Sequence, residues 1–211
     1  MAKKLVIDIK APNMRTLALT IEGTELYVQH KFSSKVRTEM EEKHKAGSTA
    51  KTTRAREKKD FTALYNEAMH LSADGWHGLP AAAFRKAMIS ACRLVGFQMT
   101  LAKLAVFIQA DGHSDDGTAL VKITKGKPYE RHDPVRNDNG SPDIRSRPAW
   151  NPGWRATLRI RYDADIFTDA HIVNLLARVG EQVGIGEGRP DSKDSAGMDW
   201  GKFRILGQGE K

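Results

Sequence analysis

The sequence predicts an α+β fold in which two helices pack on one antiparallel sheet. Three observations lead to this expectation. Residues 154–162 alternate apolar and polar side chains, as a half-buried strand does, and 168–179 then place apolar side chains at helical spacing. A further helix is indicated over 80–95, where proline suits the first helical position and Gly96 suits the end. A glycine-studded stretch, 184–201, follows the last helix and leads into a final short strand.

The remaining elements complete this arrangement. Short alternating stretches before residue 154 predict strands, at 5–9, 16–21, 26–30, 104–108 and 119–123. Residues 61–68 indicate a short helix, and 33–45 a weak, highly charged one. The order is that of a split βαβ unit, so we expect a ferredoxin-like, RRM-like antiparallel sheet with two packing helices, an N-terminal hairpin and long basic loop insertions. We expect a single domain over 1–211; a separate N-terminal domain ending near Asp74 is the alternative.

Two stretches lack the periodicity of regular structure. Residues 46–59 carry many lysines and arginines and almost no large apolar side chain, which predicts a mobile basic loop. Residues 125–153 contain five of the eight prolines, and we expect a long irregular insertion there. Both stretches are basic, so both are candidates for contact with a polyanion.

The charge balance narrows the class of partner. Lysine and arginine exceed aspartate and glutamate by eight, and such an excess attracts nucleic acid. The N-terminus has no signal-peptide pattern, no stretch is apolar enough to cross a membrane, and one cysteine, Cys92, allows no disulfide framework. We therefore expect an intracellular, cytoplasmic protein with no membrane partner.

The glycine-rich stretch 184–201 does not match the known phosphate-binding loops. Gly201-Lys202 leads into Phe203, which belongs to a strand, whereas a Walker loop enters a helix. The glycines also follow a helix, whereas those of a dinucleotide fingerprint precede one. Glycine does permit close backbone approach to a ligand, and neighbouring cations and a tryptophan supply charge and a stacking face. A plain turn around a buried tryptophan is the competing interpretation.

Arginines and aromatic residues also alternate in 131–161, the combination with which proteins hold single strands. Combining the basic loop, the first long helix, this region and the glycine-rich stretch gives one set of candidate nucleic-acid-binding residues. These are Lys51, Arg54, Arg56, Lys58, Lys59, Arg85, Lys86, Arg131, Arg136, Arg145, Arg147, Trp150, Gly186, Arg189, Trp200 and Lys202.

Catalysis has little support in the sequence. The seven histidines show no metal-ligand spacing, and no cysteine pair accompanies them. We therefore expect no metal, no cofactor and no catalytic residue. His30 and His77 are the two histidines considered as a general acid or base for RNA cleavage, although isolated histidines are usually structural.

The helix 80–95 and the segments 184–190 and 200–205 resemble those of the repeat-associated mysterious proteins, or RAMPs, over residues 79–206. That family supplies ferredoxin-like RNA-binding subunits of CRISPR effector complexes, and its glycine-rich loop likewise lies between the last helix and the final strand. The polar insert at 191–195 and the short chain depart from the family pattern. The chain is also similar to proteins encoded by bacteriophages, which would make it a stand-alone member.

These observations favour a non-catalytic binder of single-stranded RNA or DNA that assembles into a homo-oligomer or filament along the strand, with other effector-complex subunits as further partners. Two alternatives stay open. One is a metal-independent endoribonuclease of the same fold. The other is a phage protein that mimics and docks onto a CRISPR effector complex.

Overall fold

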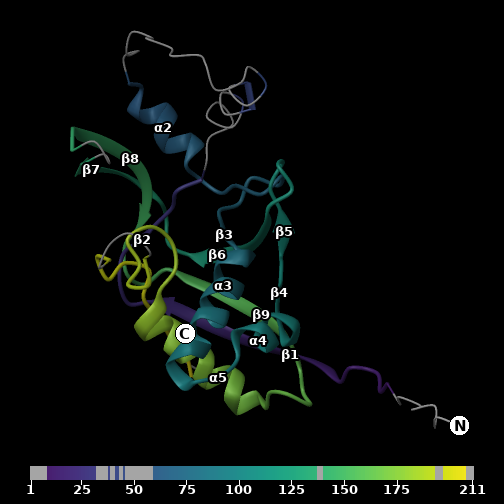
Figure 1. Ribbon diagram of the computed structural model, residues 1–211. Coiled ribbons are helices and arrows are strands. Elements are labelled where there is room, and N and C mark those ends of the chain that lie inside the picture. The colour runs from purple at the N-terminus through teal and green to yellow at the C-terminus, as the bar shows by residue number, and fades with distance from the viewer. Residues whose placement is uncertain are drawn as a thin grey trace, which may run out of the picture.

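A computed structural model describes residues 9–31, 38, 41–42, 45, 59–136, 140–192 and 197–207 (Figure 1). Within these residues the protein is mixed α+β, with antiparallel sheets. The helices are α2 (Phe61–Glu67), α3 (Ala81–Ala91), α4 (Met99–Ala105) and α5 (Asp169–Arg178). One 3-10 turn, Cys92–Val95, continues α3, and one π turn, Val179–Val183, continues α5.

The strands form two antiparallel sheets. They are β1 (Met14–Gly23), β2 (Tyr27–Val28), β3 (Gly78–Pro80), β4 (Val106–Gln109), β5 (Gly112–His113), β6 (Ala119–Lys125), β7 (Tyr129–Arg136), β8 (Pro142–Trp150), β9 (Arg155–Asp163) and β10 (Phe203–Ile205). The larger sheet has the order β10-β1-β9-β6-β3, with β4 also paired to β9 and β5 to β6. The smaller sheet has the order β2-β8-β7.

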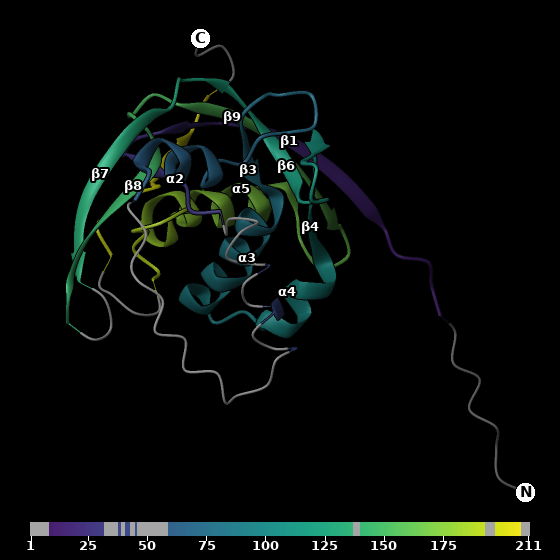
Figure 2. The ribbon, with the colours of Figure 1, turned by 90° about the horizontal axis from the view of Figure 1, so that it is seen from above.

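The two central strands bury alternate side chains. Leu19 of β1 lies opposite Leu158 of β9, and Leu17 lies opposite Ile160, so one face of the sheet is apolar. The helices α3 and α5 cover this face, as Figure 2 shows from above. One continuous cluster of buried side chains joins the sheet to both helices and contains residues from before and after Asp74. None of the helices in the described part of the chain is both long and apolar enough to span a membrane.

The two main helices confirm the expectations from sequence. The Thr168 hydroxyl accepts the backbone N–H of His171 and begins α5, and Gly96 adopts a left-handed conformation after α3. Each helix buries one apolar stripe, which includes Phe84 and Met88 on α3 and Ile172 and Leu176 on α5. The short helix expected over 61–68 is also present, as α2.

The expectation of an irregular insertion over 125–153 was wrong. Residues 129–136 and 142–150 form a regular hairpin, β7–β8, that projects from the body of the protein (Figure 1). Prolines hid these strands in the sequence, although Pro134 lies on the edge strand and Pro142 is the first residue of its strand. Both positions tolerate the missing N–H.

Smaller differences concern the expected strands. The strand placed at 104–108 begins at Val106, because residues 99–105 form α4. β2 pairs with β8, and β1 pairs with β9 and β10. The first strand of the expected N-terminal hairpin, 5–9, lies outside the described residues except for Ile9, which belongs to no strand. Most of the weak helix expected at 33–45 lies outside them too.

Candidate functional site

A groove of about 810 Å³ lies between α3 and the glycine-rich stretch. One wall is the exposed side of α3, where Ala82 and Ala83 are small and Lys86 is exposed. The opposite wall is the backbone of residues 183–189, which we call the glycine loop. Residues at the end of β2 and on β8 close the remaining side. Segments far apart in the chain therefore meet at this groove.

Backbone hydrogen bonds fix the glycine loop in place. The N–H of Glu187 donates to the carbonyl of Val28 at 3.0 Å, and the N–H of Ile185 donates to the carbonyl of Gly201 at 3.1 Å. Gly201 in turn donates to the carbonyl of Leu26 at 2.6 Å. The loop is thus attached both to β2 and to the segment before β10, and its backbone forms a defined wall.

Glycine is required at two of these positions. Gly186 has φ +82°, and a Cβ there would lie 2.6 Å from the carbonyl oxygen of Val28. Gly201 has φ +72°, and a Cβ there would collide with the carbonyl oxygen of Ile185. The glycines therefore allow the loop to pack directly on neighbouring backbone.

Three of the expected cations come together at the groove. Lys86 extends from α3, Arg145 from β8 and Arg189 from the glycine loop, and all three line the cavity. Arg189 donates to the carbonyl of Gly186 at 3.1 Å, which holds its guanidinium against the loop. Four of the expected residues thus line the same groove, namely Lys86, Arg145, Arg189 and Gly186. They come from three separate regions of the sequence.

A carboxylate lies among these cations. Glu187 Oε2 accepts the Nε hydrogen of Arg147 at 3.0 Å, and its Oε1 lies 3.6 Å from Arg145 Nη1. Arg147 is mostly buried in this pair, with 13% of its side chain exposed. Glu187 therefore holds two arginines of β8 together at the edge of the groove.

The far end of the groove is closed by a polar cluster. Asp191 accepts hydrogen bonds from the Ser90 hydroxyl at 2.5 Å and from Arg93 Nη2 at 2.8 Å. These bonds join the end of α3 to the segment after the glycine loop, so they fix the width of the groove.

Two histidines line the same cavity. His30 follows β2, and His70 follows α2. Buried Gln29 positions His70, because its Oε1 accepts the backbone N–H of His70 at 2.9 Å and its Nε2 donates to the carbonyl of Gly78 at 2.6 Å. Burial, together with the nearby charge of Lys31, lowers the pKa of His70 to about 4, so this imidazole is neutral at pH 7.

The two expected aromatic residues differ in exposure, since Trp150 lies in the core and Trp200 is half-buried. Trp150 is fully buried and packs on Tyr27 and His77, so its assignment to the binding surface is corrected to the core. The Trp200 ring lies against Gly188 and has the Arg131 guanidinium 5.0 Å from its centroid. Trp150 therefore offers no face to a base, whereas Trp200 keeps part of its surface exposed beside Arg131.

Several expected cations are held elsewhere. Arg85 donates to the carbonyls of Val106 and Lys103 and stacks on Phe107 at the edge of the main sheet, away from the groove. Arg131, Lys202 and Lys59 pair with nearby acids, which are Asp133, Asp199 and Asp143 respectively. Arg136 is exposed near the tip of the β7–β8 hairpin. Lys51, Arg54, Arg56 and Lys58 lie outside the described residues, as does the rest of the basic loop up to residue 58.

Sequence reasoning missed two residues of the groove. His70 lies in the irregular segment after α2 with no local signal, and only tertiary packing brings it near His30. Glu187 stands between two glycines, and an acid at that position gives no signal for binding a polyanion. His77, one of the two histidines considered for catalysis, packs on Trp150 and is absent from the groove lining.

Within the described residues no group of three or more histidine, cysteine, aspartate or glutamate side chains is placed to hold a metal ion. No protein-family model matches the chain, and a search of curated proteins finds no relative. The geometry of the groove is thus the basis for a functional interpretation.

Proposed function

We propose that the protein binds single-stranded nucleic acid, RNA or DNA, in the groove between α3 and the glycine loop. The observation that carries the proposal is the convergence of Lys86, Arg145 and Arg189 on one cavity that the glycine loop also lines. Cations neutralise the phosphates of a bound strand, and glycine lets a strand approach the main chain. Further copies bound along the same strand would give the homo-oligomer or filament expected from the sequence.

The proposal includes a ferredoxin-like, RAMP-type fold. Its support is the strand order β10-β1-β9-β4, with α3 between β1 and β4 in the chain and α5 between β9 and β10. Two split βαβ units joined in this way give an antiparallel sheet with both helices on one side. The glycine loop follows α5 and precedes β10, as the resemblance implies. Fold alone does not establish a function.

The test measures binding of nuclease-treated protein to labelled single-stranded RNA, single-stranded DNA and duplex DNA across a salt series, with the mass of each complex. We expect tight, salt-sensitive binding to one single strand and growth in mass with strand length. Lys86→Ala and Arg189→Ala should each weaken binding and reduce the slope of log affinity against log salt by about 1. Arg161→Ala, on the outer face of β9, is the control. Absence of binding to all three nucleic acids would reject the proposal and favour a protein partner, such as an effector complex that the chain mimics or joins.

One observation favours a second candidate, the metal-independent endoribonuclease. His30 is exposed and His70 is neutral at pH 7, and both line the groove in which a strand would lie. Desolvation lowers the pKa of His30 as well as that of His70, so both rings are suited to accept a proton as a general base. This candidate requires cleavage of bound RNA in the presence of a chelator and loss of cleavage in His30→Ala or His70→Ala. Intact RNA after prolonged incubation with excess protein would exclude it.

A further inference from the structure

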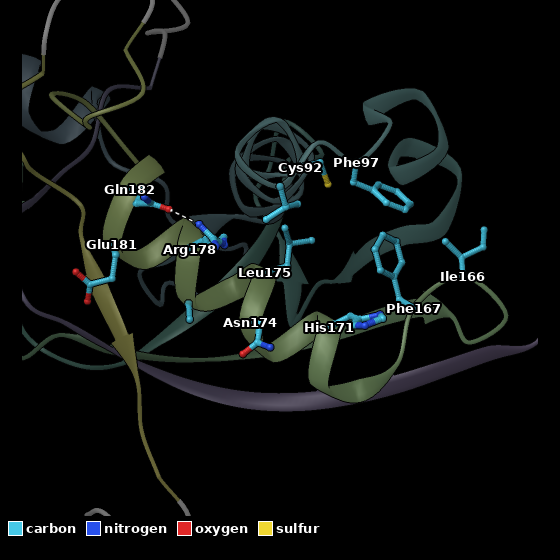
Figure 3. A pocket seen from close by; sticks show the side chains of 12 residues that line it. Cys92, Phe97, Ile166, Phe167, His171, Asn174, Leu175, Arg178, Glu181 and Gln182 are labelled. Carbon is cyan, nitrogen blue, oxygen red and sulfur yellow. Dashed lines mark hydrogen bonds between the residues drawn. The ribbon is translucent and has the colours of Figure 1, made fainter.

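A second cavity, of about 700 Å³, lies between the end of α3 and the exposed side of α5 (Figure 3). We call it the helix cavity. Its lining includes Cys92, Val95, Phe97, Phe167, Leu175 and Arg178. It shares no lining residue with the groove at the glycine loop, so any ligand it holds is additional to a nucleic-acid strand.

One side of the helix cavity is apolar. Phe97 and Phe167 pack together with ring centroids 4.9 Å apart, and Figure 3 shows both rings at one end of the cavity. Buried Leu175 and Cys92 form its floor, and Val95 at its margin is 51% exposed. Such a concave apolar surface in contact with water favours an apolar ligand, because a bound ligand removes the apolar surface from contact with water, which is favourable.

The other side presents donors along α5. Arg178 donates through Nη1 to Gln182 Oε1 at 3.2 Å, and this bond orients the guanidinium. In Figure 3 Arg178 lies beside Leu175, and the carboxylate of Glu181, which also lines the cavity, points away from both. A guanidinium has five N–H donors, so the single bond to Gln182 leaves a fork that matches a carboxylate.

The capping of α5 adds a further donor. His171 Nδ1 accepts the backbone N–H of Thr168 at 3.4 Å, so the proton of the neutral ring lies on Nε2. The ring of His171 lies near Phe167 in Figure 3, at the same end as the apolar wall. The guanidinium of Arg178 and the apolar surface therefore face one space, whose lining also includes the amide of Asn174 and the carboxylate of Glu181.

We propose that the helix cavity binds a small amphipathic carboxylate, with its alkyl or aryl tail between Phe97, Phe167 and Leu175 and its carboxylate on Arg178. The cavity volume lies within the range of sites for small molecules, roughly 300–1,000 Å³. The guanidinium of Arg178, oriented by Gln182, adjoins the apolar floor, and the carboxylate of Glu181 in the same lining points away from it, so an anionic head and an apolar tail each find a partner.

The test uses the full chain with octanoate and its uncharged counterpart 1-octanol as probes, followed by backbone amide chemical shifts. We expect saturable shifts at the amides of Cys92, Phe97 and Leu175 with octanoate, and affinity for octanol about tenfold lower, since a hydrogen bond to a charged partner contributes this much. Arg178→Met should remove this preference and keep the apolar stem.

Two exposed substitutions complete the design. Ala177→Glu, on the cavity margin, should weaken octanoate binding through like-charge repulsion and leave helix α5 intact. Arg161→Met removes an equal charge from the opposite face of the sheet and should change nothing. Absence of saturable shifts in the cavity, equal affinities for octanoate and octanol, or octanoate binding that Arg178→Met leaves unchanged would each overturn the proposal. Since nucleic-acid binding is measured separately, failure here leaves the groove proposal untouched.

Discussion

Arg147 donates its Nε hydrogen to Glu187 across 3.0 Å, and this pair holds a carboxylate of the glycine loop beside Arg145, the arginine of β8 that lines the groove. Glu187 also lies 3.6 Å from Arg145. A phosphate that enters this part of the groove must compete with Glu187 for the same guanidinium groups. The acid between the two glycines is therefore an internal competitor of the proposed ligand.

Replacement of this competitor should strengthen binding. We expect Glu187→Gln to raise affinity for single-stranded nucleic acid several-fold, on the order of threefold to tenfold, and to steepen its salt dependence by about one ion. Fluorescence anisotropy over a salt series measures both quantities. Glu181→Gln removes an equal charge from an exposed position outside the groove and serves as the control. Weaker binding in Glu187→Gln would mean that the pair positions the arginines for the ligand and does not block them.

The backbone contact at Gly201 predicts a large effect on stability. A Cβ at this position would both adopt φ +72° and collide with the carbonyl oxygen of Ile185. Gly117 has φ +79° with open space around it, so Gly117→Ala isolates the cost of the backbone conformation, about 1–2 kcal/mol. Gly201→Ala should reduce the free energy of unfolding by more than Gly117→Ala does, as measured in urea. Equal losses would show that the loop shifts easily.

The burial of Trp150 separates its structural role from binding. Trp150→Phe leaves a void beside Tyr27 and His77, and we expect it to reduce the free energy of unfolding by about 1–3 kcal/mol. Nucleic-acid affinity of the folded fraction should stay unchanged. A circular dichroism melt and a binding titration below the midpoint measure the two quantities. If Trp150→Phe weakened nucleic-acid binding and left the free energy of unfolding unchanged, Trp150 would belong to the binding surface.

The lowered pKa of His70 predicts a pH dependence of stability. Its pKa is about 4 in the folded protein and near 6.5 when unfolded, so the unfolded chain binds the extra proton between these values. The free energy of unfolding therefore receives the full contribution of the neutral His70 ring above pH 6.5. As pH falls from 6.5 toward 4, protonation of the unfolded chain lowers the free energy of unfolding by at most about 3 kcal/mol. Unfolding of His70→Gln in urea at several pH values should show a correspondingly smaller loss than the parent protein. Parallel curves would contradict the prediction.

Particular elements show how far the sequence determines this fold. Helix α5 was predicted almost to the residue, because Thr168 caps it and its apolar residues recur at helical spacing. The β7–β8 hairpin was missed, because prolines and charged residues interrupt any apolar alternation along both strands. Local patterns report burial, and β7, which buries none of its residues, leaves little trace in the sequence.

The candidate site divides in the same way. Lys86, Arg145, Gly186 and Arg189 were expected from residue type and all line the groove. Trp150 was expected to contact the ligand because aromatic residues beside arginines are typical of binding surfaces. The same residue types also occur at the edge of a core, so residue type alone does not distinguish the two. His70 depends on Gln29, a residue 41 positions away, so no local spacing could identify it.

The sequence by itself determined the α+β class, the two main helices and the need for glycine near the last strand, because helical periodicity, capping residues and turn chemistry act over a few neighbouring residues. Only the tertiary structure decided which cations share the groove, that Glu187 neutralises Arg147, and which tryptophan is core. Those relationships join residues from separate elements through side-chain packing and charge, and they exist only once β1, β9 and the two helices have come together.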